Sequence, residues 1–209
     1  MADGQGRRCV IVTARYEGAW TYERATGDMV LCADGGWRIA QAYGLAPDLV
    51  IGDFDSSARP EGMETIVHPI RKDDTDAMLC ARYGLENGCA DFLLLGGFGG
   101  RLDHTLANLQ TLAYLKAHGA RDARMRDGLR EAVVLREEVI ALPRRPGHLS
   151  LFAMGDRCEC VSVSGAEYDL QDGALTNCFP LGVSNAFRED VVRLSVRRGL
   201  LLVLTDETE

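Results

Sequence analysis

A pair of carboxylates one residue apart is the feature of the sequence best suited to chemistry. It lies in Gly52-Asp53-Phe54-Asp55-Ser56, directly after the apolar run Leu49-Val50-Ile51. If that run is a strand, alternation places Asp53 and Asp55 on one side of the chain, where both could bind one cation. Hard oxygen donors suit Mg²⁺, which takes one or two carboxylates together with phosphate oxygens and water. A simple turn would explain the same pentapeptide, because Gly, Asp and Ser are common turn residues.

A second acidic segment, Lys72-Asp73-Asp74-Thr75-Asp76, precedes an apolar pattern with helical spacing. Acidic residues are favoured in a first helical turn, which accounts for one or two of them. Three aspartates and a threonine exceed that need. If this turn faces Asp53 and Asp55, Asp76 could complete a carboxylate cluster around Mg²⁺ while Lys72 reaches a phosphate.

Two glycine-containing segments also follow apolar runs. In Ala33-Asp34-Gly35-Gly36, Asp34 could hydrogen-bond a ribose or a phosphate-bound cation, or it could cap the next helix. In Gly96-Gly97-Phe98-Gly99-Gly100 the glycines would let backbone amides approach a phosphate. Arg101 is either a phosphate-binding residue or a solvated loop arginine. For His104 we expect a structural role, because no nucleophile or metal partner is evident beside it.

These segments are positioned by alternating strands and helices between residues 9 and 118. Short apolar runs predict strands at 9–13, 29–33, 49–51, 66–67 and 91–95, and helical spacing predicts helices after Gly36, Asp76 and His104. Such alternation indicates a parallel sheet with helices on both faces. Ligands bind such sheets at the carboxyl ends of the strands, which is where all four segments fall.

The pattern changes after Arg121, in an arginine-rich stretch that contains proline. Beyond it, Cys160–Ser164 and Val192–Arg197 alternate with period two. We therefore expect an α/β domain over residues 1–126 and an all-β domain over residues 127–209. In the second half the polar residues of interest are Ser184-Asn185, which by chemistry alone read as an ordinary turn.

Composition narrows the classes of function. The net charge of −8 and the pI near 5.1 disfavour nucleic-acid binding. No Gly-Lys-Ser/Thr occurs, which excludes a Walker-type P-loop. No apolar run is long enough to cross a membrane, and residues 1–8 do not resemble a signal peptide, so we expect a cytoplasmic protein. The seven cysteines lack the spacing of a zinc site or a disulfide framework.

Taken in their order along the chain, the polar segments described above resemble those of the thiamine pyrophosphokinases (thiamine diphosphokinases) in their short bacterial form. The resemblance rests on Ala33–Gly36, Gly52–Ser56, Lys72–Asp76, Gly99–His104 and Ser184-Asn185, and it covers nearly the whole chain. It implies an N-terminal α/β domain that binds ATP and a C-terminal β-sandwich that binds thiamine. It further implies a homodimer with active sites between the subunits. The implied reaction transfers a pyrophosphoryl group from Mg-ATP to the thiamine hydroxyl, giving thiamine diphosphate and AMP.

The resemblance also implies roles for individual residues. The catalytic magnesium ligands would be Asp53, Asp55 and Asp76. ATP and its phosphates would contact Asp34, Gly35, Lys72, Asp73, Thr75, Arg101 and Asp103. Thiamine would contact Ser184 and Asn185, with an aromatic platform from Tyr168, Phe179 or Phe187. Two alternatives remain open: a non-catalytic sensor of thiamine or nucleotide, and another magnesium-dependent transferase that uses a nucleotide.

Overall fold

The structure is a computed structural model that describes residues 6–54, 59–69 and 74–206. The chain divides into two compact units, Met1–Gly128 and Leu129–Glu209. We refer to them as the first and second unit. This division lies two residues beyond the domain boundary expected from the sequence, which is between residues 126 and 127. The expected domain boundary stays a prediction.

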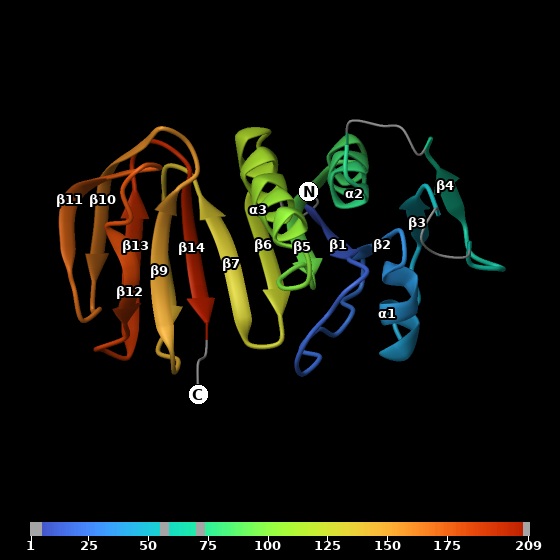
Figure 1. Cartoon of the computed structure of the whole chain (residues 1–209), viewed down its shortest axis with the longest axis horizontal. Coiled ribbons are helices and arrows are strands. Elements are labelled where there is room, and N and C mark those ends of the chain that lie inside the picture. The colour runs from blue at the N-terminus through green and yellow to red at the C-terminus, as the bar shows by residue number, and fades with distance from the viewer. Residues whose placement is uncertain (1–5, 55–58, 70–73, 207–209) are drawn as a thin grey trace, which may run out of the picture. The chain divides into compact units, whose positions relative to one another are not determined.

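The first unit is built on a parallel sheet in which the strands lie in the order β6-β5-β1-β2-β3-β4 (Figure 1). Each pair of neighbours in it is parallel, as the βαβ pattern of the sequence predicts. The strands are β1 (Arg7–Val12), β2 (Met29–Ala33), β3 (Leu49–Gly52), β4 (Thr65–Val67), β5 (Cys89–Leu95) and β6 (Asp122–Asp127).

Helices cover both faces of this sheet. They are α1 (Gly36–Ala42), α2 (Asp76–Glu86) and α3 (Leu102–Ala117). Ala40 of α1 packs with Val10 and Val12 of β1. Gly84 of α2 lies against Cys9, whose side chain points to the opposite face because successive residues of a strand alternate. Helices α2 and α3 lie side by side on that second face (Figure 1).

The second unit is entirely β. Its strands are β7 (Arg130–Leu135), β8 (Glu138–Pro143), β9 (His148–Ala153), β10 (Arg157–Ser164), β11 (Leu170–Thr176), β12 (Gly182–Ala186), β13 (Val191–Val196) and β14 (Leu201–Asp206). They form two antiparallel arrays, β12-β9-β14-β7 and β11-β10-β13-β8. Side chains from both arrays share one core, which is the architecture of a β-sandwich. The expected fold class, a parallel α/β unit followed by an all-β unit, is confirmed.

Strand β6 was not expected from the sequence, which places these residues in an irregular arginine-rich stretch. Ala123 and Met125 point into the core while Asp122 and Arg124 alternate with them on the more exposed side. The two charged residues pair with each other, Nε to Oδ2 at 2.8 Å. The segment therefore extends the parallel sheet beside β5, with Phe92 opposite Ala123.

Candidate active site

The parallel sheet brings the ends of β1, β2, β3 and β5, and the described residues that follow them, to one edge. Register pairs Val12 with Leu95 and with Cys32, so β1, β2 and β5 end at the same level. Ala33 pairs with Ile51, which brings the end of β3 beside the end of β2. The residues that follow these strands therefore lie along one edge, as expected for a ligand site in a parallel sheet.

Asp34 and Gly52 are in close contact at this edge. The backbone N–H of Asp34 donates to the carbonyl of Ile51 at 2.8 Å, and Asp34 adopts a positive φ of 42°. A Cβ at Gly52 would lie 2.9 Å from Asp34 Cα, so only glycine allows this approach. The N-cap residue of α1 is Gly35, so Asp34 precedes the N-cap position.

Asp53 follows β3 directly and is half-buried. Its neighbour Phe54 has a φ of 55° and packs against the core between the sheet and α1. Asp55, Lys72 and Asp73 lie outside the described residues. Within the described ranges, no three acidic, histidine or cysteine side chains gather closely enough to hold a metal ion. The magnesium ligand set includes Asp55, so it stays a prediction.

Thr75 and Asp76 begin α2. Thr75 is the N-cap residue, and its Oγ1 accepts a hydrogen bond from the backbone N–H of Met78 at 3.2 Å. Its hydroxyl hydrogen can still donate to a phosphate. Asp76 occupies the first turn, where a carboxylate is favoured by the helix dipole. Asp74 forms an ion pair with Arg82 at 2.7 Å, which accounts for one carboxylate of this acidic segment.

The glycine segment after β5 is shaped by close packing. A Cβ at Gly96, which has a φ of 85°, would lie 1.9 Å from the carbonyl oxygen of Arg15. Asn108 of α3 donates from Nδ2 to the carbonyl of Gly97 at 3.2 Å. These contacts hold the loop between the segment after β1 and the first turns of α3. The loop borders a pocket of about 230 Å³.

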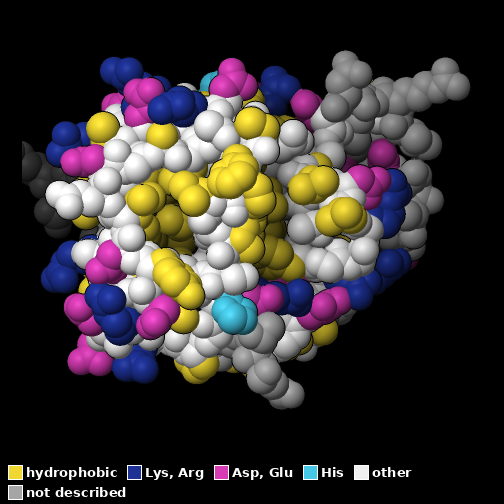
Figure 2. Space-filling view, turned by 60° about the vertical axis from the view of Figure 1, so that its left-hand side comes forward, with side chains coloured by type: hydrophobic (Ala, Val, Ile, Leu, Met, Phe, Trp, Pro, Cys, Tyr) yellow, Lys and Arg dark blue, Asp and Glu magenta, His cyan; other side chains and the backbone are white. Residues whose placement is uncertain are grey.

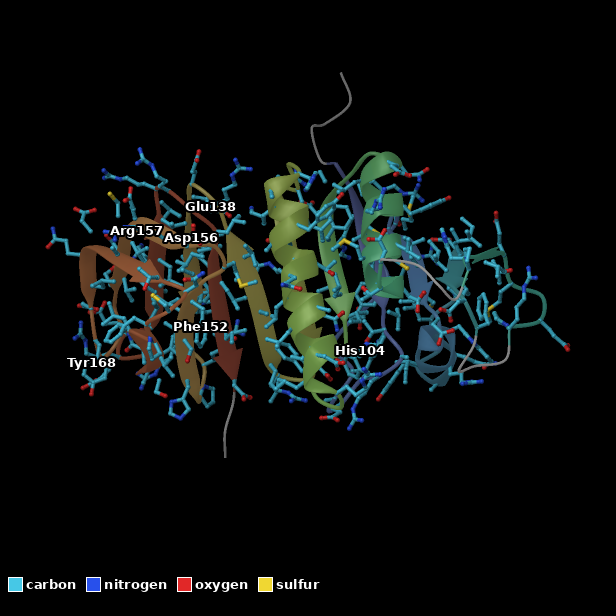
Figure 3. The ribbon with its side chains drawn as sticks, turned by 45° about the horizontal axis from the view of Figure 1, so that its top comes forward. His104, Glu138, Phe152, Asp156, Arg157 and Tyr168 are labelled. Atoms are coloured by element: carbon cyan, nitrogen blue, oxygen red, sulfur yellow. The ribbon has the colours of Figure 1, made fainter. Side chains whose placement is uncertain are left out.

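Arg101 and His104 line this pocket, and Asp103 supports the arginine. Asp103 accepts two hydrogen bonds from Arg101, the shorter at 2.5 Å, and one from the backbone N–H of His104 at 2.9 Å. The hydrogen bond from Arg101 lowers the pKa of the Asp103 carboxyl group. His104 lies in the first turn of α3 (Figure 3). Asp103 therefore holds the guanidinium of Arg101, and the nucleotide contact that the resemblance implies for Asp103 stays a prediction.

Thr13 and Arg15 also line the pocket, and neither was predicted from the sequence. Thr13 Oγ1 lies within hydrogen-bonding distance of the carbonyl oxygens of Leu95, at 3.2 Å, and Arg15, at 3.0 Å. Both residues follow β1 at the same sheet edge as Asp34 and Asp53. Ligands bind parallel sheets at the carboxyl ends of the strands, and this rule could have identified Thr13 and Arg15 as it identified the two aspartates.

Ser184 and Asn185 lie in strand β12, so the interpretation of this dipeptide as a turn is wrong. Ser184 is exposed, has a φ of 61°, and donates its backbone N–H to Ser150 Oγ at 3.1 Å. Asn185 is buried, and its side-chain amide makes hydrogen bonds to both backbone groups of Tyr168. Asn185 borders a pocket of about 170 Å³ that is also lined by Tyr168, Leu181 and Val183, whereas Ser184 is not among its lining residues.

The three candidates for an aromatic platform differ in exposure. Phe187 is 7% exposed and belongs to the core of the second unit, so it cannot stack on a ligand. Tyr168 is 71% exposed and Phe179 66% exposed. Figure 3 shows the Tyr168 ring at the periphery, directed outward. Hydrophobic side chains gather around a hollow on the face shown in Figure 2.

The first unit thus has the site of a nucleotide-binding α/β protein: carboxylates, an arginine and a close-packed glycine loop at the carboxyl ends of parallel strands. Two family models match the chain. The thiamin pyrophosphokinase catalytic domain matches residues 23–121, and the vitamin B1 binding domain of the same family matches residues 137–201. The chain belongs to the thiamin pyrophosphokinase family.

Individual relatives agree with the family models. The chain is 25% identical over 177 residues to thiamine pyrophosphokinase 1 of Oryza sativa subsp. japonica, which is 76% of this chain and 66% of the rice protein. Its fold is similar to thiamine pyrophosphokinase of Bacillus subtilis, with a TM-score of 0.85, 18% identity, and coverage of 97% of this chain and 100% of that one. A family protein of Enterococcus faecalis gives a TM-score of 0.79 at 24% identity, with the same coverage.

The family and the enzyme class expected from the sequence are therefore confirmed. Members of the thiamin pyrophosphokinase family are kinases that transfer a pyrophosphoryl group to thiamine, and membership implies the use of ATP. Among the helices of the described ranges, none is long and apolar enough to cross a membrane.

Proposed function

We propose that this chain transfers the pyrophosphoryl group of Mg-ATP to thiamine. The reaction takes place at the edge of the parallel sheet where Asp34 follows β2 and Asp53 follows β3, which we call the acidic edge. The hydroxyethyl oxygen of thiamine attacks the β-phosphorus of ATP, and the bond from that phosphorus to the oxygen bridging to the α-phosphorus breaks. The products are thiamine diphosphate and AMP. The observation that carries the proposal is the contact between Asp34 and Gly52, which holds Asp34 beside the start of the Gly52–Ser56 segment.

The donor set of this edge fits magnesium. Asp34 is buried, Asp53 is half-buried, and Asp76 is held at the start of α2, so hard oxygen donors follow β2, β3 and the Thr75 cap. Asp53, Asp55 and Asp76 would hold the ion, which when bound would neutralise charge on the phosphates. One carboxylate of this set would accept the proton of the thiamine hydroxyl.

The remaining polar residues of the first unit would bind the nucleotide. Arg101, held by Asp103, would contact phosphate oxygens, and the Thr75 hydroxyl would donate to another. Lys72, Asp73 and Gly35 would complete the nucleotide contacts. Transfer of this kind depends on positioning and on neutralising charge, which these residue types supply.

The second unit would bind thiamine. Its pocket is lined by apolar side chains and by Tyr168, an exposed aromatic ring suited to stack on a flat cationic heterocycle. Ser184 is exposed between Val183 and Asn185, two residues that line the pocket, and its hydroxyl is able to hydrogen-bond a ring substituent.

A homodimer with active sites between the subunits would use the exposed apolar residues of the second unit. Phe179, Leu181 and Val183 follow one another closely in the chain and are all exposed. Apolar side chains gathered in this way are typical of protein interfaces.

ATP use and the free thiols of the seven cysteines favour a cytoplasmic location.

The test is an incubation of the protein with Mg-ATP and thiamine, following nucleotide and thiamine products together. Equal amounts of AMP and thiamine diphosphate would support the proposal. ADP with thiamine monophosphate would show single phosphoryl transfer instead. Thiamine binding by calorimetry without any product would favour the non-catalytic sensor.

A further inference from the structure

Arg15 lies at the acidic edge but belongs to none of the segments that carry the family resemblance. It follows β1, and its carbonyl oxygen rests against Gly96 so closely that any side chain there would collide with it. A Cβ at Gly100 would lie 3.3 Å from both Cδ and Nη1 of Arg15, which places the guanidinium against that glycine. The backbone of Arg15 is therefore fixed by Gly96, and its side chain lies along the glycine loop.

The pocket formed by these segments contains two arginines, Arg15 and Arg101, with His104 beside them. Each arginine is paired with the carboxylate two residues further along the chain. Arg15 Nη2 lies 2.5 Å from Glu17 Oε1, and Arg101 Nη2 lies 2.5 Å from Asp103 Oδ2. Each of these two ion pairs is therefore local, because the arginine and the carboxylate belong to the same segment.

The pair between Arg15 and Glu17 is exposed, with 58% and 38% of the two side chains accessible. Exposed ion pairs are weak because water screens them and because they immobilise two long side chains. A polyphosphate presents several charged acceptor oxygens, which a guanidinium can bind by two parallel hydrogen bonds. Such a ligand can displace a single solvated carboxylate.

We propose that Arg15 is a second phosphate-binding arginine of the nucleotide site, and that Glu17 occupies its guanidinium only in the absence of nucleotide. The proposal rests on the proposed function, since it takes the pocket beside the glycine loop as the phosphate site. In it, Arg15 and Arg101 approach the phosphate chain from β1 and from the start of α3. The glycines between them leave room for both side chains and for the ligand.

The experiment compares Arg15→Gln, Arg15→Lys and Glu17→Gln with the wild-type protein. Arg121→Gln is the matched control, because Arg121 is also a half-exposed arginine paired with a carboxylate, Asp91, but lies at the amino end of β6. Affinity for Mg-bound, non-hydrolysable ATP analogue is measured by calorimetry at several salt concentrations. Unfolding midpoints check that each variant is folded.

We expect Arg15→Gln to raise the Kd for the ATP analogue at least about tenfold, with a shallower salt dependence. Arg15→Lys should restore part of this loss, and Glu17→Gln should bind as tightly as wild type or a few-fold more tightly. The Arg121→Gln control should bind as wild type.

Wild-type affinity in Arg15→Gln, with intact turnover in the parent protein, would overturn this proposal and leave the proposed function standing. An equal loss in Arg15→Gln and Glu17→Gln would also overturn it, because the pair would then act only as a structural support. Failure of the wild-type protein to bind the ATP analogue would overturn both proposals.

Discussion

Asn185 holds Tyr168 by both backbone groups of the tyrosine. The N–H of Tyr168 donates to Asn185 Oδ1 at 3.0 Å, and Asn185 Nδ2 donates to the Tyr168 carbonyl at 2.8 Å. Oδ1 also accepts from the backbone N–H of Ala186 at 2.9 Å. The asparagine is 9% exposed, whereas Tyr168 is largely exposed. We infer that Asn185 positions the segment that presents Tyr168. Asn185 also lines the pocket of the second unit, and its contact with thiamine stays a prediction.

Replacing Asn185 by alanine should therefore impair thiamine binding indirectly. The change leaves two backbone groups of Tyr168 without their partners, and we expect a loss of about 1–3 kcal/mol in the free energy of unfolding. The KM for thiamine should rise while the KM for ATP stays unchanged. Asn87→Ala is the control, because Asn87 makes an exposed amide hydrogen bond to Tyr83 at the end of α2. An unchanged stability in Asn185→Ala would contradict the positioning role.

The aromatic residues of the second unit should separate into a binding residue and a core residue. Tyr168→Ala should raise the KM for thiamine with little effect on stability, because the ring is exposed. Phe187→Ala should instead cost about 3–5 kcal/mol of unfolding free energy, since the ring is buried in the core. Urea unfolding and steady-state kinetics on the same preparations check both. Equal KM effects from Tyr168→Ala and Phe179→Ala would count against Tyr168 as the specific platform.

Gly52→Ala should damage the acidic edge directly. The added Cβ would meet backbone atoms of Asp34, Cα at 2.9 Å and N at 3.2 Å, so one of the two strand ends must move. We expect a loss of about 1–3 kcal/mol in stability and a larger loss of turnover. Gly155→Ala, where a Cβ would meet nothing within 4 Å, is the control. Full activity in Gly52→Ala would show that the position of Asp34 is not critical.

The acid stability of the first unit should depend on Asp28. Burial alone would raise the pKa of this carboxyl group, but hydrogen bonds from Arg8 and Tyr22 outweigh it and lower the pKa below 3.8. A carboxylate with a lowered pKa in the folded state contributes stability above its ordinary pKa, and that stability is lost as the pH falls through the folded value.

Asp28→Asn should therefore lower stability near pH 7 by about 2 kcal/mol and flatten the decline of stability below about pH 4. Unfolding midpoints measured from pH 2 to pH 8 check this, with Asp122→Asn as a control for an exposed carboxylate pair. A variant with the same acid decline as wild type would refute the assignment to Asp28.

The fold of the first unit was predictable because its strands are continuous apolar runs. Leu49–Gly52 and Cys89–Leu95 are buried over most of their length, and such runs are typical of parallel sheets. Strand β6 escaped prediction because Asp122 and Arg124 alternate with buried residues and resemble a solvated loop in sequence. Its place in the sheet is decided by pairing with β5, which no local pattern encodes.

The candidate site was predictable where it follows strand ends and unpredictable where it depends on distant contacts. Asp34 and Asp53 could be predicted because ligands bind parallel sheets at the carboxyl ends of the strands. The contact of Asn185 with Tyr168 joins residues 17 positions apart and gives no signal in the local sequence. The same holds for the glycine at position 96, whose packing against Arg15 could not be distinguished from a phosphate-binding role by spacing alone.

The most direct measurement of the central claim is the turnover of Asp53→Asn with Mg-ATP and thiamine, beside wild type and Asp122→Asn. Asp53 is half-buried directly after β3, whereas Asp122 begins β6 at the other end of the sheet. We predict that Asp53→Asn lowers the rate of thiamine diphosphate formation about a hundredfold or more while the protein stays folded, and that Asp122→Asn retains activity. Wild-type turnover in folded Asp53→Asn would contradict the assignment of the reaction to this acidic edge.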